Sequence, residues 1–313
     1  MTKRIVIVGS INLDLVASAD RVPVAGETIS GQTFQTFFGG KGANQAVAVA
    51  RLRYPVSMVA KVGDDTFGPQ LRKALRDAGV DVKAVKTVKG ASGVALIATG
   101  SRRENSIIVI PGANGKVLPR DLDHHKSLIT SAGMLLTQLE SPLETVEYLG
   151  RLAKKFDVPL MLDPAPARSL PENLIKHISW LTPNETETRI LLGANQELEP
   201  ARAADELRAR GARNVVLKLG DKGAYVATAD GQRADIPAFP VRPVDTTAAG
   251  DAFNGAFAVA LLQGKAVTES ARYACAVAAI SVTRAGAQPS MPSRSEVQKF
   301  LKQHSHGQSA SAG

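Results

Sequence analysis

Short apolar runs rich in β-branched residues alternate with apolar residues at helical spacing along most of the chain. The runs predict buried strands at Ile5–Val8, Val56–Val62, Met134–Gln138, Val158–Leu162 and Val215–Leu219. The helical spacing predicts helices at Ala43–Leu52, Phe67–Ala78, Leu143–Lys154, Ala201–Arg210, Phe253–Leu262 and Glu269–Val282. Strands that alternate with helices favour an α/β fold with a mainly parallel sheet and helices on both of its faces.

Two regions break this alternation. Asp14–Ala19 with Ile29–Phe38, and Gly93–Ala98 with Ser106–Ile110, have the pattern of strand pairs without a helix between them. We expect these strands to form a small separate sheet, which would lie as a lid over the strand ends where such folds bind ligands. If its outer face is apolar, the same sheet could pair with a second subunit.

Length and composition bound the class of protein. The chain has 313 residues, 44% of them hydrophobic, and can bury a full core. The apolar run after Met1–Arg4 is too brief for a signal peptide, and no uninterrupted apolar segment reaches membrane-spanning length. Cys275 is the only cysteine, which excludes an intramolecular disulfide and favours a reducing, cytoplasmic location. The small, polar residues from Ser305 to Gly313 predict a disordered tail after a single domain of residues 1–304.

The net charge of +9 comes from 38 Lys and Arg against 29 Asp and Glu. The basic residues are scattered among acidic ones, and only 4% of residues are aromatic. These features favour a solvated basic surface that helps to attract anionic substrates over a surface that binds nucleic acid.

The most informative stretch runs from Asp245 to Gly255, with the sequence DTTAAGDAFNG. A β-branched run at 241–244 precedes it and a long apolar run follows, so we expect a strand, a tight turn and a buried helix. The first N–H groups of such a helix have no intrahelical partner, and the small residues Ala248, Ala249 and Gly250 leave them uncovered. Together with the helix dipole, these amides predict a site for a phosphoryl group.

Asp251 follows this glycine and would project a carboxylate into the same site. One interpretation is functional, because phosphoryl transfer uses a carboxylate near the phosphorus to accept the proton of the attacking hydroxyl. The other is structural, with Asp251 capping the helix. The spacing alone leaves both open.

Two further segments carry polar groups near predicted strand ends. The turn Gly39–Asn44 precedes a helix but matches neither a Walker A loop nor a dinucleotide fingerprint. Its glycines would let amides approach a polar ligand while Asn44 supplies a donor and an acceptor; an ordinary turn with an exposed lysine is the alternative. Asn12 and Asp14 point to one side of an extended chain and suit vicinal hydroxyls of a sugar, although both residue types are also common in turns.

Carboxylates follow other predicted strands. Glu140 and Asp163 come at the carboxyl ends of two of them, which face the ligand crevice in a parallel sheet. Asn184 and Glu187 begin a helix, where they could form a capping box, reach Mg²⁺ or its waters near phosphates, or do both. Lys218–Gly223 is a strand end with two glycines and suits a nucleotide. No Cys/His zinc spacing, metalloprotease helix or nucleophile-elbow motif occurs.

In this order, the motifs resemble the ribokinase family of carbohydrate kinases, also called the PfkB family. The resemblance extends from about residue 4 to about residue 292 and is carried by Gly9–Asp14, Phe38–Ala46, Gln138–Pro142, Asp163–Arg168, Thr182–Glu187 and Asp245–Gly255. It implies a three-layer α/β/α sandwich with a β-sheet lid, here about residues 14–38 and 93–110, that commonly serves as the dimer interface.

The resemblance also implies roles at matching positions. Asp251 would take the proton from a primary sugar hydroxyl, and the amides of Ala248, Ala249 and Gly250 would form the anion hole for the γ-phosphate of ATP. The sugar would be bound by Asn12, Asp14, Gly40, Lys41, Asn44, Glu140 and Asp251. Asn184 and Glu187 would serve the phosphates and Mg²⁺. The nucleotide site would also include Lys218, Gly220, Asp221, Gly223, Gly250 and Cys275.

Members of the family also bind a monovalent cation, K⁺, beside the anion hole. The matching positions are Asp245, Thr247, Ser281, Arg284, Gly286 and Ser290. Backbone carbonyls would supply most ligands, and the ion would neutralise Asp245 and fix the amides of the loop in position. Cys275 falls where bacterial relatives often have His near the adenine, which leaves the nucleotide preference open.

We therefore expect a homodimeric kinase that uses ATP and Mg²⁺, is activated by K⁺, and phosphorylates O5 of D-ribose. Deoxyribose, fructose, a nucleoside or a keto-deoxy sugar acid are alternative substrates, and a non-catalytic sugar-binding regulator is the alternative class. Asn12 favours ribose, because its amide can bond a hydroxyl that deoxyribose lacks. Asp251 and the intact loop of small residues favour an enzyme. We expect no nucleic-acid or membrane partner.

Overall fold

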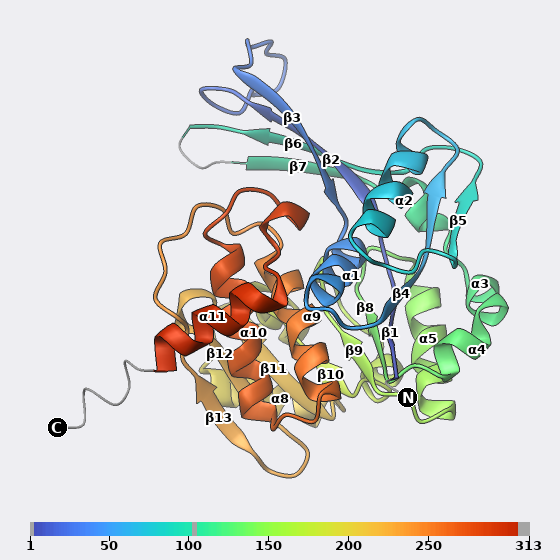
Figure 1. Cartoon of the computed structure of the whole chain (residues 1–313). Helices are drawn as coiled ribbons and strands as arrows, with labels where there is room; N and C mark the ends of the chain where they lie inside the picture. Colours follow the sequence, from blue (N-terminus) through green and yellow to red (C-terminus); the bar gives the residue numbers. More distant parts are fainter. Residues whose placement is uncertain (1–2, 102–104, 306–313) are drawn as a thin grey trace.

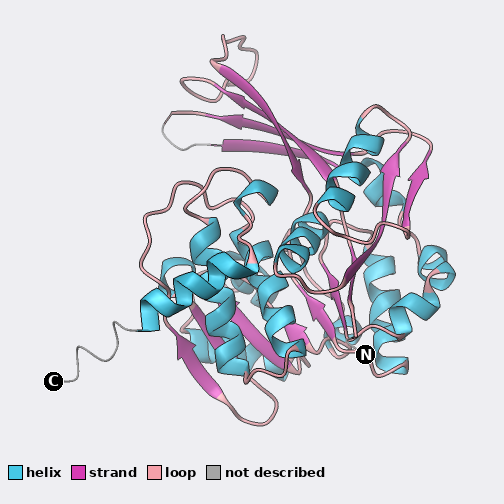
Figure 2. Ribbon diagram, viewed as in Figure 1, coloured by secondary structure: helices cyan, strands magenta, loops and turns pink. Residues whose placement is uncertain are grey.

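The fold combines a large buried sheet with a small sheet that projects from the body (Figure 1). It is known from a computed structural model, which describes residues 3–101 and 105–305. Figure 2 shows helices on both sides of the large sheet, while the small sheet has none on its outer side.

The strands, in chain order, are β1 (Ile5–Val8), β2 (Asn12–Ser18), β3 (Thr33–Gly39), β4 (Val56–Gly63), β5 (Val85–Val88), β6 (Gly93–Thr99), β7 (Asn105–Ile110), β8 (Met134–Thr137), β9 (Leu160–Leu162), β10 (Trp180–Leu181), β11 (Asn214–Lys218), β12 (Ala224–Ala227) and β13 (Arg233–Ile236). The α-helices are α1 (Lys41–Arg51), α2 (Phe67–Asp77), α3 (Pro119–His124), α4 (Lys126–Thr130), α5 (Leu143–Lys155), α6 (Glu172–Ile175), α7 (Glu185–Leu192), α8 (Pro200–Ala209), α9 (Ala249–Leu262), α10 (Val267–Ser281) and α11 (Arg294–Ser305). Short 3-10 helices lie at η1 (Gly112–Lys116), η2 (Gly220–Lys222) and η3 (Gln288–Ser290).

Within the described residues, the large sheet has the order β13-β12-β11-β10-β9-β8-β1-β4-β5 and is parallel from β11 to β5. Side chains of β1 alternate between two cores. Ile5 and Ile7 pack with α1, α2, α9 and α10, whereas Val6 and Val8 pack with α3, α4 and α5. A third core joins α7 and α8 to β9 and β11. A sheet buried on both faces confirms the predicted three-layer α/β/α sandwich.

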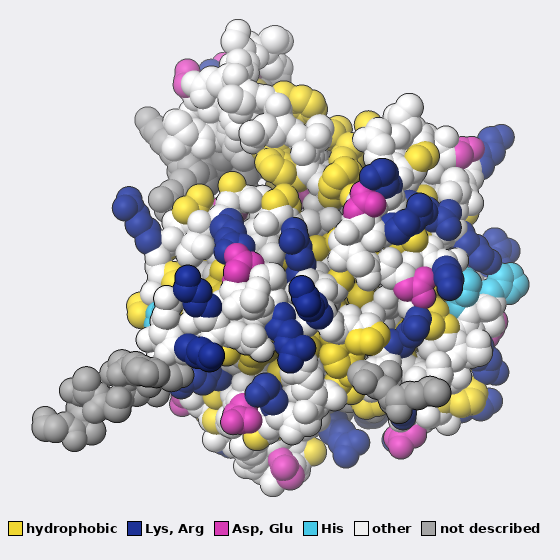
Figure 3. Space-filling model, viewed as in Figure 1, with side chains coloured by type: hydrophobic (Ala, Val, Ile, Leu, Met, Phe, Trp, Pro, Cys, Tyr) yellow, Lys and Arg dark blue, Asp and Glu magenta, His cyan; other side chains and the backbone are white. Residues whose placement is uncertain are grey.

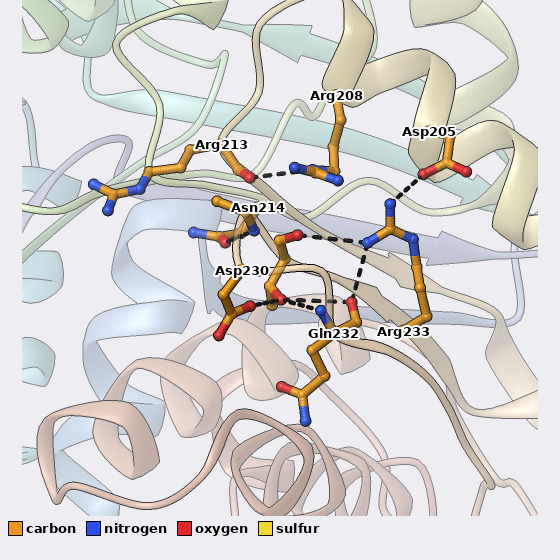
Figure 4. A network of polar contacts seen from close by, with 9 residues as sticks. Asp205, Arg208, Arg213, Asn214, Asp230, Gln232 and Arg233 are labelled. Carbon is orange, nitrogen blue, oxygen red and sulfur yellow. Dashed lines mark hydrogen bonds and ion pairs between the residues drawn. The ribbon is translucent and has the colours of Figure 1, made fainter.

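The antiparallel edge of the large sheet, β12 and β13, is held by exposed polar contacts (Figure 4). Asn214 accepts a hydrogen bond from the amide of Ala229 at 2.9 Å, and the guanidinium of Arg233 pairs with Asp205 of α8 at 2.6 Å. These contacts lie at the end of the sheet where β11 and β13 begin, opposite the end at Lys218. They therefore stabilise the edge of the sheet and lie away from the predicted site residues, which are at its carboxyl end.

The small sheet, which we call the lid sheet, consists of β3, β2, β6 and β7 in that order among the described residues. β2 pairs with β3 antiparallel and with β6 parallel, and β6 pairs with β7 antiparallel. This arrangement confirms the predicted pairs of lid strands. Apolar side chains remain exposed on it, including Phe34 at 66% and Ile108 at 61%.

The surface carries mixed charge. Figure 3 shows Lys and Arg side chains interspersed with Asp and Glu over the helices of one face, with hydrophobic side chains gathered where the lid sheet meets the body. This pattern agrees with the predicted solvated basic surface. Every helix in the described ranges is too short or too polar to cross a membrane.

Three sequence predictions need correction. Residues 237–248 form an irregular segment and not a strand, because Pro240 and Pro243 remove backbone donors around Val241. The next helix begins at Ala249 and not at Phe253. The tail was predicted to begin at residue 305, but that residue ends α11; residues 306–313 lie outside the described residues.

Candidate active site

A cavity of about 570 Å³ opens at the carboxyl edge of the large sheet. It lies between α9, α10, the start of α7 and the turn after β11. It collects every residue predicted for the nucleotide: Asn184, Glu187, Lys218, Gly220, Asp221, Gly223, Gly250 and Cys275. Lys41, Asp163 and Asp251 also line it. The structure thus brings the predicted nucleotide residues to the end of the sheet where parallel folds bind ligands.

Asp251 lies in the first turn of α9 and is buried. Its two oxygens accept hydrogen bonds from Asn44 Nδ2 at 3.0 Å and Gln45 Nε2 at 3.1 Å. The N-cap position of α9 is occupied by Ala248, and no side chain makes a capping hydrogen bond there. The alternative role of Asp251 as the helix cap is therefore wrong. Burial, opposed by the charge of Lys41, raises the pKa of Asp251 to about 7. A carboxyl group with such a pKa suits proton transfer near neutral pH.

The turn before α9 leaves backbone donors without a protein acceptor. Ala248 adopts the left-handed conformation, with φ of 59°. The amide of Ala249, which was predicted to belong to the anion hole, instead bonds to the carbonyl of Thr246. The described residues supply no acceptor for the amides of Ala248, Gly250 and Asp251. These donors converge at the positive end of a long helix, which is the geometry of an anion site.

Lys218 brings a positive charge to the same place. Its ammonium lies 2.8 Å from Asp163 Oδ1. The same ammonium lies close to Gly250, since a Cβ added there would be 3.2 Å from Lys218 Nζ. Asp163 is itself buried and accepts a second bond from Gln45 Nε2 at 3.1 Å. The ion pair therefore holds the lysine against the open amides of α9.

Asn184 and Glu187 form the capping box that the sequence allowed. Asn184 Oδ1 accepts from the amide of Glu187 at 2.7 Å, and Glu187 Oε2 accepts from the amide of Asn184 at 2.7 Å. Burial, opposed by the charge of Lys218, raises the pKa of Glu187. Since Glu187 also lines the cavity and keeps a second oxygen, this donor set fits Mg²⁺ or its waters.

The predicted sugar residues lie on the lid side of Asp251. Glu140 Oε2 accepts from the amide of Lys41 at 3.1 Å and from the hydroxyl of Ser10. Burial, together with the nearby Glu140, raises the pKa of Asp14 to about 6. Asn44, in the same helix as Lys41, donates to Asp251, and its own Oδ1 is buried without a partner among the described residues. The site therefore has a polar end beneath the lid sheet that adjoins the cavity at Lys41 and Asp251.

Two charged or bridging groups stand out between these ends. Burial disfavours the ammonium of Lys41, but Asp251 and the other carboxylates around it outweigh burial and raise its pKa. Gln45 joins Asp163 to Asp251 through one amide nitrogen, and its oxygen accepts from Gln138 Nε2 at 2.7 Å. Gln45 and Gln138 lie within motifs that sequence reasoning noticed, yet they were not assigned a role there.

Asp245 ties together the two loops predicted to hold K⁺. Its oxygens accept from the amides of Thr247 at 2.9 Å and Gly286 at 2.8 Å. The hydroxyls of Ser281 and Ser290 donate to carbonyls of their own turns, and Arg284 pairs with Glu296 and not with the loop. The described ranges contain no group of three or more His, Cys, Asp or Glu that could hold a metal ion.

Comparisons with known proteins agree with this architecture. A family model described as pfkB family carbohydrate kinase matches residues 2–294. The chain is 41% identical over 305 residues to the ribokinase of Haemophilus influenzae, covering 96% of this chain and 99% of that protein. It is 38% identical to the deoxyribokinase of Salmonella typhimurium, covering 95% of this chain and 98% of that one. The structure of Arabidopsis thaliana ribokinase complexed with ribose and ATP matches with a TM-score of 0.89 and 38% identity, over 96% of this chain and 99% of that one.

Proposed function

The chain belongs to the pfkB family of carbohydrate kinases, and we propose that it transfers the γ-phosphoryl group of ATP to O5 of D-ribose. The observation that carries the proposal is the position of Asp251. Its buried carboxylate lies between side chains suited to a sugar and the open amides of α9. Similarity to ribokinases along nearly the whole chain supports ribose as the sugar.

In the proposed mechanism, Asp251 accepts the proton of O5 as that oxygen attacks the γ-phosphorus. Asn44 and Gln45 hold the carboxylate in place, and its raised pKa makes it a competent acceptor near neutral pH. The amides of Ala248, Gly250 and Asp251 hold the phosphoryl oxygens, where negative charge accumulates during transfer. The ammonium of Lys218 adds positive charge beside them.

Two ions belong to this proposal. Mg²⁺, held by Glu187 and Asn184 directly or through waters, supplies charge neutralisation on the phosphates when bound. K⁺ would bind between the loops that Asp245 joins, where Thr247 and Gly286 already donate to its carboxylate. Thr247 directly precedes the anion-hole residues, so a bound cation would stiffen the turn that presents their amides.

We also propose that the protein is a homodimer formed through the lid sheet. β7 is exposed along its entire length, and four of its six residues, Ile107–Ile110, are large and apolar. An exposed apolar strand of this kind is a liability in a monomer unless a partner covers it. Light scattering on Ile108→Lys should show a monomer where the unaltered protein is a dimer; an unchanged mass would remove β7 from the interface.

The test of function is ADP release coupled to a colour reaction, measured with ribose, deoxyribose, fructose and a nucleoside, with and without K⁺. We expect the highest kcat/KM with ribose and a rise when K⁺ is added. Turnover of another sugar but not of ribose would overturn the substrate assignment and leave the kinase class intact. Calorimetry that detects ribose binding but no ATP binding would favour a regulator.

A further inference from the structure

Asn114 lies in η1, after the last lid strand β7, and its side chain bonds Ile11 and the predicted sugar residue Asn12. Its side chain is 1% exposed. The Oδ1 atom accepts from the amide of Ile11 at 2.9 Å, while Nδ2 donates to the carbonyl of Ile11 at 3.1 Å and to Asn12 Oδ1 at 2.7 Å. Both amide hydrogens and the carbonyl oxygen of this side chain are therefore committed.

These bonds leave the amide of Asn114 one orientation. Ile11 offers a fixed backbone donor to its oxygen and a fixed backbone acceptor to its nitrogen, so exchanging the two atoms would break both bonds. The nitrogen of Asn114 must then face Asn12, and the oxygen of Asn12 must accept its hydrogen bond. The Nδ2 group of Asn12 consequently points away from Asn114, and no acceptor for it exists within the described ranges.

Glycines on the two neighbouring strands make room for this arrangement. Asn12 pairs in register with Gly39 of β3 and Gly93 of β6. A Cβ at Gly93 would lie 2.1 Å from Asn114 Nδ2 and 2.2 Å from Asn12 Oδ1. A Cβ at Gly39 would lie 2.2 Å from Asp14 Oδ2. Glycines at these two positions of the neighbouring strands therefore leave room for the side chains of Asn12 and Asp14.

We propose that Asn114 is a positioning residue that makes Asn12 a hydrogen-bond donor to the sugar and so sets the preference for ribose. The inference rests on the proposed function. Asn12 and Asp14 lie on the same side of β2, and the carboxylate of Asp14 only accepts when ionised. A hydroxyl has one proton, so it can donate to Asp14 only if its other neighbour donates to it. Asn12, oriented by Asn114, is that neighbour.

A sugar without this hydroxyl would leave the N–H groups of Asn12 unpaired, which is costly in a buried site. Asn12 is only 3% exposed in the empty site, and a bound sugar would cover it further. If Asn114 were a carboxylate, Asn12 would turn its nitrogen toward it and present its oxygen to the sugar. Two acceptors would then compete for one hydroxyl proton.

The test compares Asn114→Asp with the unaltered enzyme on ribose and 2-deoxyribose. We expect the KM for ribose to rise by about tenfold or more, the KM for deoxyribose to change far less, and kcat and the KM for ATP to stay close to their original values. Asn173→Asp, the same exchange at an exposed position on α6, away from the lid sheet and the cavity, is the matched control and should change none of these constants.

A double-mutant cycle separates positioning from a general structural role. In an Asn12→Ala background, Asn114→Asp should change the KM for ribose by less than about twofold, because the group it orients is gone. Multiplicative effects of the two changes, or equal losses with both sugars, would overturn the proposal. Asn114→Ala, which removes the group that orients Asn12 and adds no bulk, is used in the same cycle if Asn114→Asp does not fold.

The proposed function is checked separately by the unaltered enzyme. If it does not phosphorylate ribose, the substrate assignment fails, and the cycle is run on the sugar that the panel identifies. Non-additivity between Asn12 and Asn114 on that sugar would still support the positioning role, and additivity would still contradict it.

Discussion

Helices α1 and α9 pack against each other, and each begins at a turn of small residues on the same edge of the sheet, but their first amides are used differently (Figure 1). At α1, the amide of Lys41 donates to Glu140, and those of Gly42 and Ala43 donate to the side chain and carbonyl of Ser10. At α9, several amides have no protein acceptor in the described ranges. The same local element is closed in one place and available to an anion in the other.

The charges nearby follow the same division. The start of α1 is surrounded by carboxylates, with Glu140 accepting from its first amide and Asp14 close by. The start of α9 has the ammonium of Lys218 against Gly250. A neutral, hydroxyl-rich ligand suits the first environment and a phosphate suits the second. The comparison teaches that a glycine-rich helix start acquires its function from what its amides already bind.

The variant expected to have the largest effect is Asp251→Asn. It removes the proposed base between the start of α1, which suits the sugar, and the start of α9, which suits the phosphate. We expect kcat to fall by about a thousandfold, because an amide cannot accept the O5 proton, while ribose still binds. Coupled ADP release gives kcat, and calorimetry gives the ribose affinity. Asp230→Asn, at an exposed carboxylate in the distant β12–β13 turn, should leave both unchanged. Retained turnover in Asp251→Asn would remove this residue as the base.

Gly250→Asp tests the open helix start by filling it with a carboxylate. We expect kcat/KM for ATP to fall by about a hundredfold, because the new charge competes for the amides and Lys218. The same change should not destabilise the protein, since an acidic side chain in the first turn favours the helix by about 0.3–1 kcal/mol.

Thermal unfolding measured beside the kinetics separates these two effects. Ala201→Asp, at the exposed start of α8, offers the same helix-start charge away from the cavity and should leave kcat/KM for ATP unchanged. If Gly250→Asp kept normal ATP kinetics while folding well, the open amides of α9 would not be the anion site.

Glu140→Gln tests the closed helix start. Loss of the charge weakens the bonds that hold the amide of Lys41 and the hydroxyl of Ser10, so the sugar side should lose its shape. We expect the KM for ribose to rise about tenfold while the KM for ATP stays nearly constant. Glu144→Gln, exposed in the first turn of α5, is the control. Equal losses for both substrates would contradict the division into a sugar half and a phosphoryl half.

Much of the site could be predicted because parallel strands bring their carboxyl ends to one edge. Asp163 directly follows β9 and Lys218 ends β11, and both line the cavity. Glu140 comes shortly after β8 and accepts from the amide of Lys41, a residue that also lines the cavity. The capping box at Asn184 is local in sequence and was also foreseeable. Period and spacing therefore suffice where a role depends on neighbours along the chain or on a common sheet edge.

The residues that sequence reasoning missed depend on distant partners. Gln45 bridges two carboxylates that lie 118 and 206 positions away, and Asn114 orients a residue 102 positions away. No period in the chain encodes such a pairing. The strand predicted just before Asp245 was wrong although the relevant residues are local. The β-branched residues of segment 237–248 favour a strand, but Pro240 and Pro243 prevent the segment from pairing in a sheet.

The smallest expected effect concerns Asp14, whose pKa of about 6 makes the sugar half sensitive to pH. The ionised form accepts sugar hydroxyls, so ribose affinity should strengthen a few-fold as pH rises from about 5 to about 7. Stability should move the other way. Because the folded pKa lies above the ordinary value of 3.8, the contribution of Asp14 to stability is full below that value and is lost as pH rises through about 6.

Asp14→Asn should therefore bind ribose more weakly at pH 8 with a flattened pH dependence, yet be more stable there by about 1–3 kcal/mol, since no buried charge must form. Calorimetry without ATP and thermal unfolding, each run at pH 5 and pH 8, measure both quantities. Asp20→Asn, an exposed carboxylate just beyond the end of β2, serves as the control. A variant that kept the pH dependence of the unaltered enzyme would show that another group governs it, and the carboxylates around α1 would then stabilise that helix start without sensing the sugar.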